Sequence, residues 1–205
     1  MPAPKAIVFD LGQVLVELDL KPISTALKLV PTGSDNIAKL KSLESWKPFD
    51  DFERGLLDSE TFYTESRNHF NLDLDERAFW TLWNTIIKAP LRESEAIVRT
   101  LFDRSIPLFI LTNSNAVHFA FVQEMIPWLK RFDHLFSSHI LGLRKPEIAI
   151  YQKVAESVGI PPSELLFIDD RKENIDGALE SGWIAEWCPN AAKDLPRIMS
   201  QYRLS

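Results

Sequence analysis

Five polar residues, spread over most of the chain, carry side chains that can do chemistry together if the fold brings them into one place. In chain order they are Asp10, Thr112, Lys145 and the adjacent pair Asp169 and Asp170. Carboxylates that share a crevice repel one another unless a cation neutralises them, and Mg²⁺ does so with a few oxygen ligands and retained waters. A hydroxyl beside successive backbone N–H groups suits a phosphate oxygen. The set therefore indicates phosphate chemistry supported by Mg²⁺.

Taken singly, each of these residues also fits a purely structural role. Asp10 and the acid pair are also suited to capping turns or helices, and Ser114 or Asn115 would cap a helix that follows Thr112. Lys145, before Pro146, reads alone as a surface lysine. The chemical interpretation therefore depends on their joint order and on where the chain places them.

The acids and the hydroxyl stand at the ends of short apolar runs, the pattern of strands that are covered on both faces. These runs span 6–9, 108–111 and 165–168, and a further run spans 183–187. Helical patterns lie between and after them, at 146–158, 174–181 and 191–203. Strands that alternate with helices predict a parallel sheet with right-handed crossovers, which binds ligands beyond the carboxyl ends of its strands. We therefore expect the polar ends to converge on one crevice.

Residues 19–90 differ from this pattern because they contain no clear buried strand. Helical segments are expected at 21–29, 34–45, 59–69 and 75–87, and aromatic residues to fill a small helical core are Trp46, Tyr63, Trp80 and Trp83. The predicted fold class is α/β, with a Rossmann-like parallel sheet core in residues 1–18 and 91–205 and an inserted all-helical cap domain in residues 19–90.

Composition excludes several classes of protein. The chain has 205 residues, of which 45% are hydrophobic and 25% charged, as in ordinary globular domains. The net charge of -6 argues against a protein that coats nucleic acid, and the single Cys188 excludes an internal disulfide framework. The four histidines lack metal-ligand spacing. Neither a signal peptide nor a membrane span is expected, so the default is a cytoplasmic protein; the oligomeric state is not predicted.

The polar residues and their flanking strands resemble, in order, the four motifs of the haloacid dehalogenase-like superfamily. The first motif is matched by residues 7–15, the second by 108–113, the third by Lys145-Pro146 with Tyr151, and the fourth by 165–170 with Asn174 and Gly177. The insertion resembles the helical cap that follows the first motif. Its segment 52–55 and the variant first motif resemble a subgroup that contains the bacterial alpha-D-glucose 1-phosphate phosphatase and the amino-terminal phosphatase domain of soluble epoxide hydrolase.

This resemblance implies that Asp10 is the nucleophile and forms an aspartyl-phosphate that water hydrolyses. It implies that Lys145 fixes Asp10 and the transferring phosphoryl group. Phosphate oxygens would be held by Thr112 and by the backbone N–H of Asn113. From the cap, Arg54 is the residue that we expect to face the crevice and to hold a substrate oxygen.

The same resemblance implies a Mg²⁺ site. Its ligands would be the Asp10 side chain, the backbone carbonyl of Gly12 and Asp170, with Asp169 acting through a bound water and Asn174 supporting the site from behind. In the superfamily's phosphatases a second Asp, two residues after the nucleophile, protonates the leaving oxygen. Here that position is Gly12. We expect a slower phosphatase, or one that relies on an acidic leaving group, a water or a cap residue such as Glu53 or His69.

Three functions fit these residues. The first is a Mg²⁺-dependent phosphatase acting on a small phosphorylated metabolite, with sugar phosphates favoured by the subgroup resemblance. The second is a haloacid dehalogenase, which uses the same Asp nucleophile without metal and needs no general acid. The third is a catalytically weak or dead binding protein. Retention of both Asp169 and Asp170 argues against the second function, and retention of Asp10, Thr112 and Lys145 argues against the third.

Overall fold

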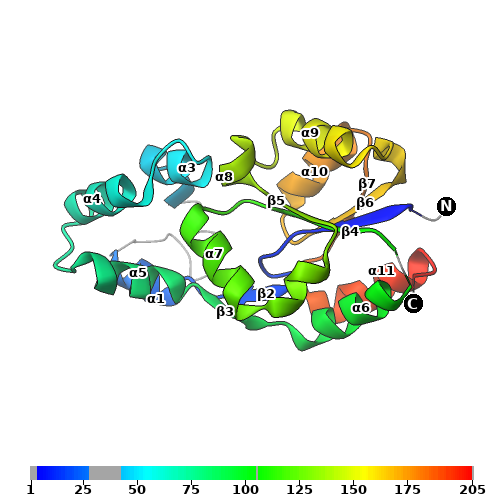
Figure 1. Ribbon diagram of the computed structural model, residues 1–205, viewed down its shortest axis with the longest axis horizontal. Helices are drawn as coiled ribbons and strands as arrows, with labels where there is room; N and C mark the ends of the chain where they lie inside the picture. The colour runs from blue at the N-terminus through cyan, green and yellow to red at the C-terminus, as the bar shows by residue number, and fades with distance from the viewer. Residues whose placement is uncertain (1–3, 28–42, 105, 205) are drawn as a thin grey trace.

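The structure, a computed structural model, describes residues 4–27, 43–104 and 106–204. Within these ranges five strands form a parallel sheet in the order β5-β4-β1-β6-β7 (Figure 1). The strands are β1 (Ala6–Phe9), β4 (Leu108–Thr112), β5 (His134–Ser137), β6 (Leu165–Asp169) and β7 (Ile184–Trp187). The earliest strand lies at the centre, paired with β4 and β6, so the three strands that end in polar residues are neighbours. The α/β prediction is confirmed.

Helices cover both faces of this sheet. In Figure 1, α9 (Ile148–Val158) and α10 (Lys172–Glu180) lie above it, and α6 (Arg92–Asp103) and α11 (Ala191–Gln201) lie below it. Helix α7 (Ala116–Met125) follows β4, and the short α8 (Ser138–Leu141) follows β5. Single 3-10 turns at Pro127–Arg131 and Pro162–Glu164 precede β5 and β6. Each polar strand end is therefore followed by a loop that leads into a helix or turn.

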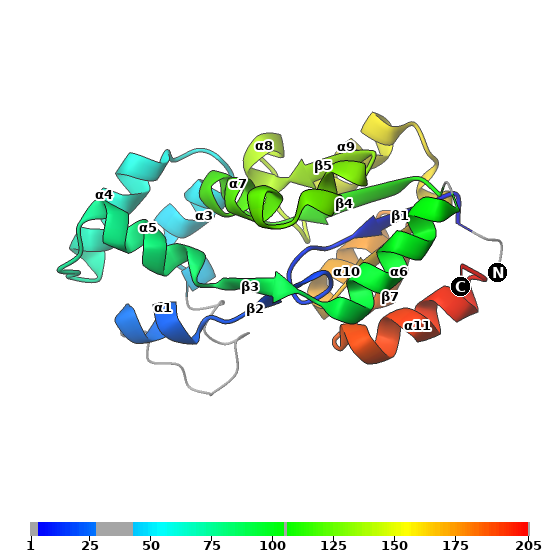
Figure 2. The same ribbon diagram turned by 60° about the horizontal axis from the view of Figure 1, so that its bottom comes forward.

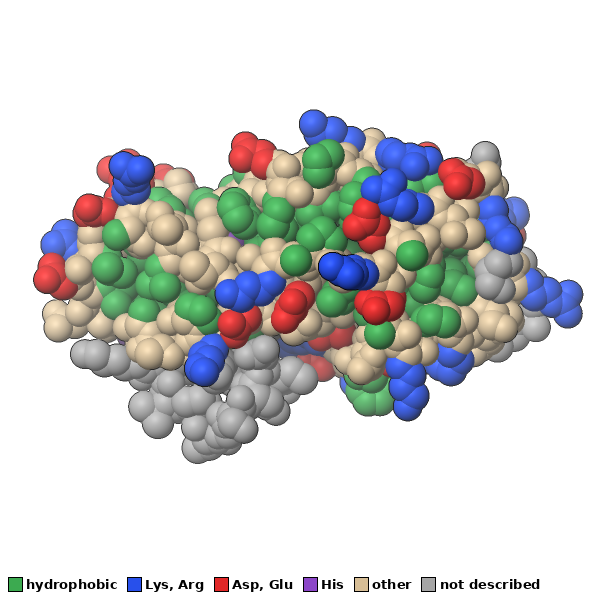
Figure 3. Space-filling model, turned by 90° about the horizontal axis from the view of Figure 1, so that it is seen from below, with side chains coloured by type: hydrophobic (Ala, Val, Ile, Leu, Met, Phe, Trp, Pro, Cys, Tyr) green, Lys and Arg blue, Asp and Glu red, His purple; other side chains and the backbone are tan. Residues whose placement is uncertain are grey.

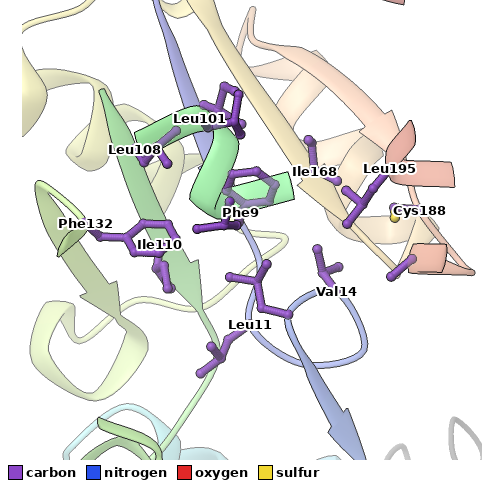
Figure 4. Packing of buried hydrophobic residues seen from close by; sticks show 14 of the residues in the cluster. Phe9, Leu11, Val14, Leu101, Leu108, Ile110, Phe132, Ile168, Cys188 and Leu195 are labelled. Atoms are coloured by element: carbon purple, nitrogen blue, oxygen red, sulfur yellow. The ribbon is translucent and has the colours of Figure 1, made fainter. Parts of the chain in front are cut away.

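The alternation of side chains along β1 explains why its sequence is apolar throughout. Ile7 and Phe9 belong to the cluster that packs against α6 and α11, whereas Val8 belongs to the cluster under α9 and α10. All three are fully buried, and burial of each such side chain contributes roughly 1.5–3 kcal/mol. Figure 4 shows Phe9 packed among side chains of the neighbouring strands and helices, with Cys188 at the edge of the same cluster. Burial raises the pKa of the Cys188 thiol to about 12, in keeping with a packing role.

A short antiparallel pair of strands joins the core to the insertion. It consists of β2 (Val16–Leu18) and β3 (Ile87–Pro90), which lie side by side in Figure 2. The sequence pattern did not predict β3, because only four residues form it and they are half-buried or exposed. The helix expected at 75–87 is accordingly shorter: α5 spans Glu76–Asn84.

The described part of the insertion is otherwise helical and has its own apolar cluster. Its helices are α1 (Lys21–Ala26), α3 (Lys47–Glu53), α4 (Ser59–His69) and α5. Asp58 and Asp75 cap α4 and α5 by accepting from backbone N–H groups. The centre of the cluster is aromatic, with Phe52, Phe62, Phe79 and Trp83 each at most 2% exposed. The helix expected at 34–45 lies almost entirely outside the described residues, and the boundaries at 18 and 90 stay predictions.

On the face shown in Figure 3, basic and acidic side chains are interspersed, and neither sign gathers into one broad patch. Among the described helices, none has the length and apolar composition to cross a lipid bilayer.

Candidate active site

One cavity of about 370 Å³ opens beyond the carboxyl ends of the central strands. Residues from all four polar motifs line it: Asp10, Gly12, Thr112, Asn113, Lys145 and Asp170. Asp10 follows β1, Thr112 ends β4 and Asp170 follows β6, so the parallel topology alone brings them together. The predicted convergence of the strand ends on one crevice is thus observed, and the size is that of a small-ligand site.

Lys145 connects the carboxylates at the base of this cavity. Its Nζ lies 2.7 Å from Asp10 Oδ1, 2.6 Å from Asp169 Oδ2 and 2.8 Å from the carbonyl oxygen of Leu111. Burial alone would lower the pKa of Lys145, but the charges of Asp10 and Asp169 outweigh it and raise the pKa above its ordinary value. The lysine is therefore a fixed positive charge beside Asp10, and not the surface residue that the sequence alone permits.

Two asparagines hold this ion pair in place. The side chain of Asn113 clamps the backbone of Lys145: Nδ2 donates to the Lys145 carbonyl and Oδ1 accepts from its N–H, each at 2.9 Å. The amide of Asn174 donates to both carboxylate oxygens of Asp169 at 3.0 Å, and the backbone N–H of Arg171 donates to Asp169 Oδ1 at 2.8 Å. Asp169 is thus held on two sides, and it orients Lys145.

Asp170 differs from its neighbour in having no such support. Among the described residues, no side chain donates a hydrogen bond to its carboxylate or forms an ion pair with it. Burial, followed by repulsion from Asp10 and Asp169, raises the pKa of Asp170 to about 8. Burial likewise raises the pKa of Asp10 to about 6, with Lys145 opposing the shift. The site therefore carries more negative charge than its own lysine balances.

A divalent cation fits this group of acids, which we call the acidic cluster: Asp10, Asp169 and Asp170. Each offers a carboxylate oxygen, and these oxygens lie within 4.8 Å of one another. When all three carboxylates are ionised, they carry two more negative charges than the ammonium of Lys145 neutralises. Hard oxygen donors of this kind select Mg²⁺, which also accepts a backbone carbonyl and waters. Gly12 lines the same cavity, where its carbonyl is the remaining predicted ligand.

The loop after β4 provides groups that suit a phosphate. Thr112 is buried, and Asn113 and Ser114 follow it along the cavity. Asn115 caps α7 by accepting from the backbone N–H of His118 at 3.0 Å, so the capping role expected of Ser114 or Asn115 belongs to Asn115. The first backbone N–H groups of α7 add partial positive charge at this end of the cavity.

The loop after β1 shows how the chain accommodates Gly12. A Cβ atom at Gly12 would lie 2.7 Å from Leu18 Cδ1, so the β2 side chain occupies the space that an aspartate here would need. The next residue, Gln13, stands where the superfamily usually has glycine and adopts a left-handed φ of 56°. Its Nε2 donates to the carbonyl of Leu18 at 3.1 Å. The end of the Leu18 side chain thus lies next to the position of the missing acid.

The two cap residues suggested as substitutes for that acid have different positions. Glu53, at the end of α3, lines the cavity and is 7% exposed. Burial raises the pKa of Glu53 to about 7, against the opposing charge of Arg144, whose guanidinium lies 2.6 Å away. His69 is exposed, stacks on Trp46 at 4.9 Å, and is not among the described residues that line the cavity.

Arg54 does not take the position that the sequence suggested. Its guanidinium pairs with Asp50 at 2.8 Å and with Glu147 of the core, and it is absent from the described lining of the cavity. The next residue explains this placement, because Gly55 packs its backbone against α8: a Cβ there would lie 2.2 Å from the carbonyl oxygen of His139. Arg54 thus lies at the junction between insertion and core, where it pairs with Glu147.

A charged pair that sequence reasoning missed also lines the cavity. Arg171 donates to Glu44 at 2.6 Å, which joins the loop after β6 to the insertion. Arg171 directly follows the acid pair, so its position in the sequence was a usable signal. Glu44 has no such signal, because its role depends on how the insertion packs on the core.

Comparisons with known proteins agree with this geometry. A family model described as haloacid dehalogenase-like hydrolase matches residues 4–182. A sesquiterpene phosphatase of Aspergillus oryzae is 27% identical over 180 residues, covering 88% of this chain and 87% of the relative. A D-ribitol-5-phosphate phosphatase of Bacteroides thetaiotaomicron is 27% identical over 190 residues, covering 87% and 89%.

A solved structure is similar over nearly the whole chain. It is the magnesium complex of a HAD family enzyme from Bacteroides thetaiotaomicron, with a TM-score of 0.79 and 25% identity, covering 96% of this chain and 98% of that one. The likeness therefore includes the insertion as well as the sheet.

Proposed function

The chain belongs to the haloacid dehalogenase-like hydrolase family, and from that premise we propose that it is a Mg²⁺-dependent phosphatase that acts through an aspartyl-phosphate on Asp10. The observation that carries the proposal is the acidic cluster with one lysine. Lys145 forms ion pairs with Asp10 and Asp169, whereas the carboxylate of Asp170, which lies within 4.8 Å of theirs, forms no ion pair with a described side chain. The two full-length phosphatase relatives support the same reaction class.

Asp10 is suited to be the nucleophile. In the first step one of its carboxylate oxygens bonds to phosphorus while the bond from phosphorus to the leaving oxygen breaks. In the second step a water oxygen bonds to phosphorus, and inorganic phosphate leaves as the Asp10 carboxylate is restored. With a pKa of about 6, Asp10 is mainly ionised at neutral pH. Bound Mg²⁺ supplies positive charge that offsets the acidic cluster and the phosphoryl oxygens.

Lys145 and the loop after β4 hold the group that is transferred. Lys145 fixes Asp10 Oδ1 at 2.7 Å and places an ammonium beside the developing charge. Thr112 and the backbone N–H of Asn113 are the proposed donors to the phosphoryl oxygens. Asn113 also holds Lys145 through its side chain, so one loop positions both the phosphate and the lysine.

Glu53 is the proposed proton donor to the leaving oxygen, in place of the acid missing at Gly12. It lines the cavity from the cap side, and a pKa of about 7 gives it a substantial protonated fraction at neutral pH. After the first step the resulting carboxylate can take a proton from the attacking water. Its backbone carbonyl accepts from Ser138 Oγ at 2.6 Å, which ties its position to the core.

The organic part of the substrate is not fixed by the family. The subgroup resemblance favours a sugar phosphate, and the D-ribitol-5-phosphate phosphatase supports a phosphorylated polyol. The sesquiterpene phosphatase supports a phosphorylated hydrocarbon skeleton instead. Both are small phosphorylated metabolites, and the side chains beyond the phosphate end of the cavity distinguish between them.

An aryl phosphate assay tests the proposal. We expect p-nitrophenyl phosphate to be hydrolysed with Mg²⁺, and the activity to be lost on chelation and to fall by about 10⁴-fold or more in Asp10→Asn. Hydrolysis of a 2-chloroacid without metal would favour the dehalogenase. Failure with phosphate esters, acyl phosphates and chloroacids, in a folded protein, would favour the binding protein. Asp176→Asn, on an exposed turn of α10, is the matched control.

A further inference from the structure

Part of the cavity lining is apolar. We call it the apolar wall, and its residues come from β2, β3 and the insertion: Leu18, Leu20, Leu43, Phe49, Ile86 and Ile87. Four of them are buried in the helical cluster of the insertion, and Leu18 packs against that cluster. Their positions are therefore set by packing, and they contribute hydrocarbon to the lining of the cavity.

This apolar wall begins directly beside the reacting atoms. Leu18 lies against Gly12, with its Cδ1 2.7 Å from the place a Cβ would take, and Gly12 is two residues from Asp10. Leu18 is therefore close to the place where the ester group of a phosphate held by Thr112 and Asn113 would begin.

Several polar groups beside the apolar wall form hydrogen bonds or ion pairs with one another. The amide of Gln13 donates to the Leu18 carbonyl, and Glu44 accepts from Arg171 at 2.6 Å and from Arg144 at 3.1 Å. The ring of His118 lies between Asn115 Nδ2 at 3.2 Å and the Trp83 carbonyl at 3.0 Å. A polyol that entered this space would exchange its bonds to water for competition with these pairs, which is unfavourable for each hydroxyl group.

We propose that the leaving group is an apolar alcohol, so that the substrates are phosphate monoesters of hydrocarbon chains and not of sugars. The inference rests on the proposed phosphatase function and specifies the substrate class of the same site. The phosphate end is charged and fixed, while the ester group is recognised by its fit to the apolar wall. Binding should therefore grow with buried chain length, because each methylene removed from water adds a similar increment.

A chain-length series tests this. We would measure kcat/KM for ethyl, butyl, hexyl and octyl phosphate beside glucose 6-phosphate and ribitol 5-phosphate. We expect kcat/KM to rise by about fourfold per added methylene until the cavity is filled, mostly through KM, and both sugar phosphates to be poor substrates. A flat series, or a preference for either sugar phosphate, would overturn the inference.

A binding series separates this inference from the proposed function. Alkylphosphonates of the same lengths are not hydrolysed, and their effect on Tm is measured with Mg²⁺ present. If the Tm shift grows with chain length in a protein that hydrolyses no phosphate ester, the proposed phosphatase function is wrong and the apolar binding site is supported. If aryl phosphate is hydrolysed but the Tm shift does not depend on chain length, the phosphatase function is supported and the preference for an apolar alcohol is wrong.

Matched substitutions locate the effect. Ile87→Thr places a hydroxyl on the apolar wall at a half-buried position, and we expect it to lower kcat/KM for octyl phosphate by about tenfold while ethyl phosphate changes little. Ile97→Thr makes the same change at a half-buried position that packs on the core outside the cavity lining. Equal effects of the two substitutions would contradict a specific role for the apolar wall.

Discussion

The wall of the cavity that the sheet supplies and the wall that the insertion supplies differ in what holds their side chains. On the sheet side, Asp10 and Asp169 are fixed by a buried lysine and by hydrogen bonds of 2.6–3.0 Å. On the insertion side, residues such as Phe49 and Ile86 are fixed by packing within an aromatic cluster. The first arrangement suits a reaction that needs charges at defined points, whereas the second suits selection by shape and hydrophobicity.

Glu53 belongs to the insertion but is proposed to act on the leaving oxygen, and its replacement should have the largest effect of any substitution in the insertion. If it protonates the leaving oxygen, Glu53→Gln lowers kcat for alkyl phosphates by about 10²–10⁴-fold and changes p-nitrophenyl phosphate hydrolysis much less, because nitrophenolate leaves without a proton. Both rates would be measured over pH 5–9.

The control for that substitution is Asp50→Asn. Asp50 pairs with the same Arg144 at 2.6 Å but is not in the described lining of the cavity. Equal losses on alkyl and aryl phosphates in Glu53→Gln would show that Glu53 acts on structure and not on the leaving group.

His118, in helix α7 of the core, tests the contact between the core and the insertion. It stacks on Trp83 of the insertion, and burial lowers its pKa from 6.5 to about 4, with the hydrogen bond to the Trp83 carbonyl opposing the shift. The folded state therefore favours neutral His118. Its contribution is complete above pH 6.5 and is lost as pH falls toward 4, because the unfolded chain takes up the proton first.

The corresponding measurement is the free energy of unfolding in urea between pH 7.5 and 4. We expect His118→Gln to remove a loss of at most about 3 kcal/mol from the pH profile, and His134→Gln, at an exposed position, is the control. If the free energy of unfolding of the wild type depended on pH in the same way as that of His118→Gln, this would contradict the burial of His118 against the insertion.

Asp170 tests the electrostatic role proposed for the wall of the cavity that the sheet supplies. Since burial and two neighbouring acids raise its pKa, Asp170→Asn should raise Tm in metal-free buffer, where it removes repulsion. With Mg²⁺ at a hundredfold excess over its Kd, the wild type should gain about 2.7 kcal/mol, and the variant should lose most of that gain. Thermal unfolding with and without Mg²⁺ measures both effects. A full Mg²⁺ response in Asp170→Asn would contradict the proposed ligand set.

Arg54 is expected to give the smallest effect. Its pair with Glu147 crosses from the insertion to the core, but the two side chains are 21% and 39% exposed. Arg54→Ala should therefore cost less than about 1 kcal/mol, decreasing with added salt, and change KM for aryl phosphate by less than about twofold. A tenfold rise in KM would contradict this expectation and would support the contact with substrate that the sequence suggested for Arg54.

The two walls also differ in how far the sequence predicted them. Strands ending in Asp10, Thr112 and Asp169 could be located because doubly covered strands are apolar throughout and their polar ends must meet in a parallel sheet. Edge strand β5 was missed, since its first residues are exposed or half-buried and only the last two are buried.

The insertion was predictable as a helical unit but not as a binding surface. Its aromatic residues indicated a core, whereas the orientation of Arg54 and the packing of Leu18 against Gly12 depend on contacts between segments far apart in the chain. Neither residue has a local pattern that reveals its partner. Sequence spacing therefore located the polar residues at the strand ends more fully than the residues of the apolar wall.

The role of Asp10 as nucleophile is tested most directly by stopping a single turnover within milliseconds in acid and locating the phosphoryl group by mass spectrometry of peptides. We predict one phosphoryl group on the peptide that contains Asp10, present with Mg²⁺ and absent in Asp10→Asn. Turnover of substrate with no phosphoryl group on Asp10 at any time point, or with the group on another residue, would contradict the proposed mechanism.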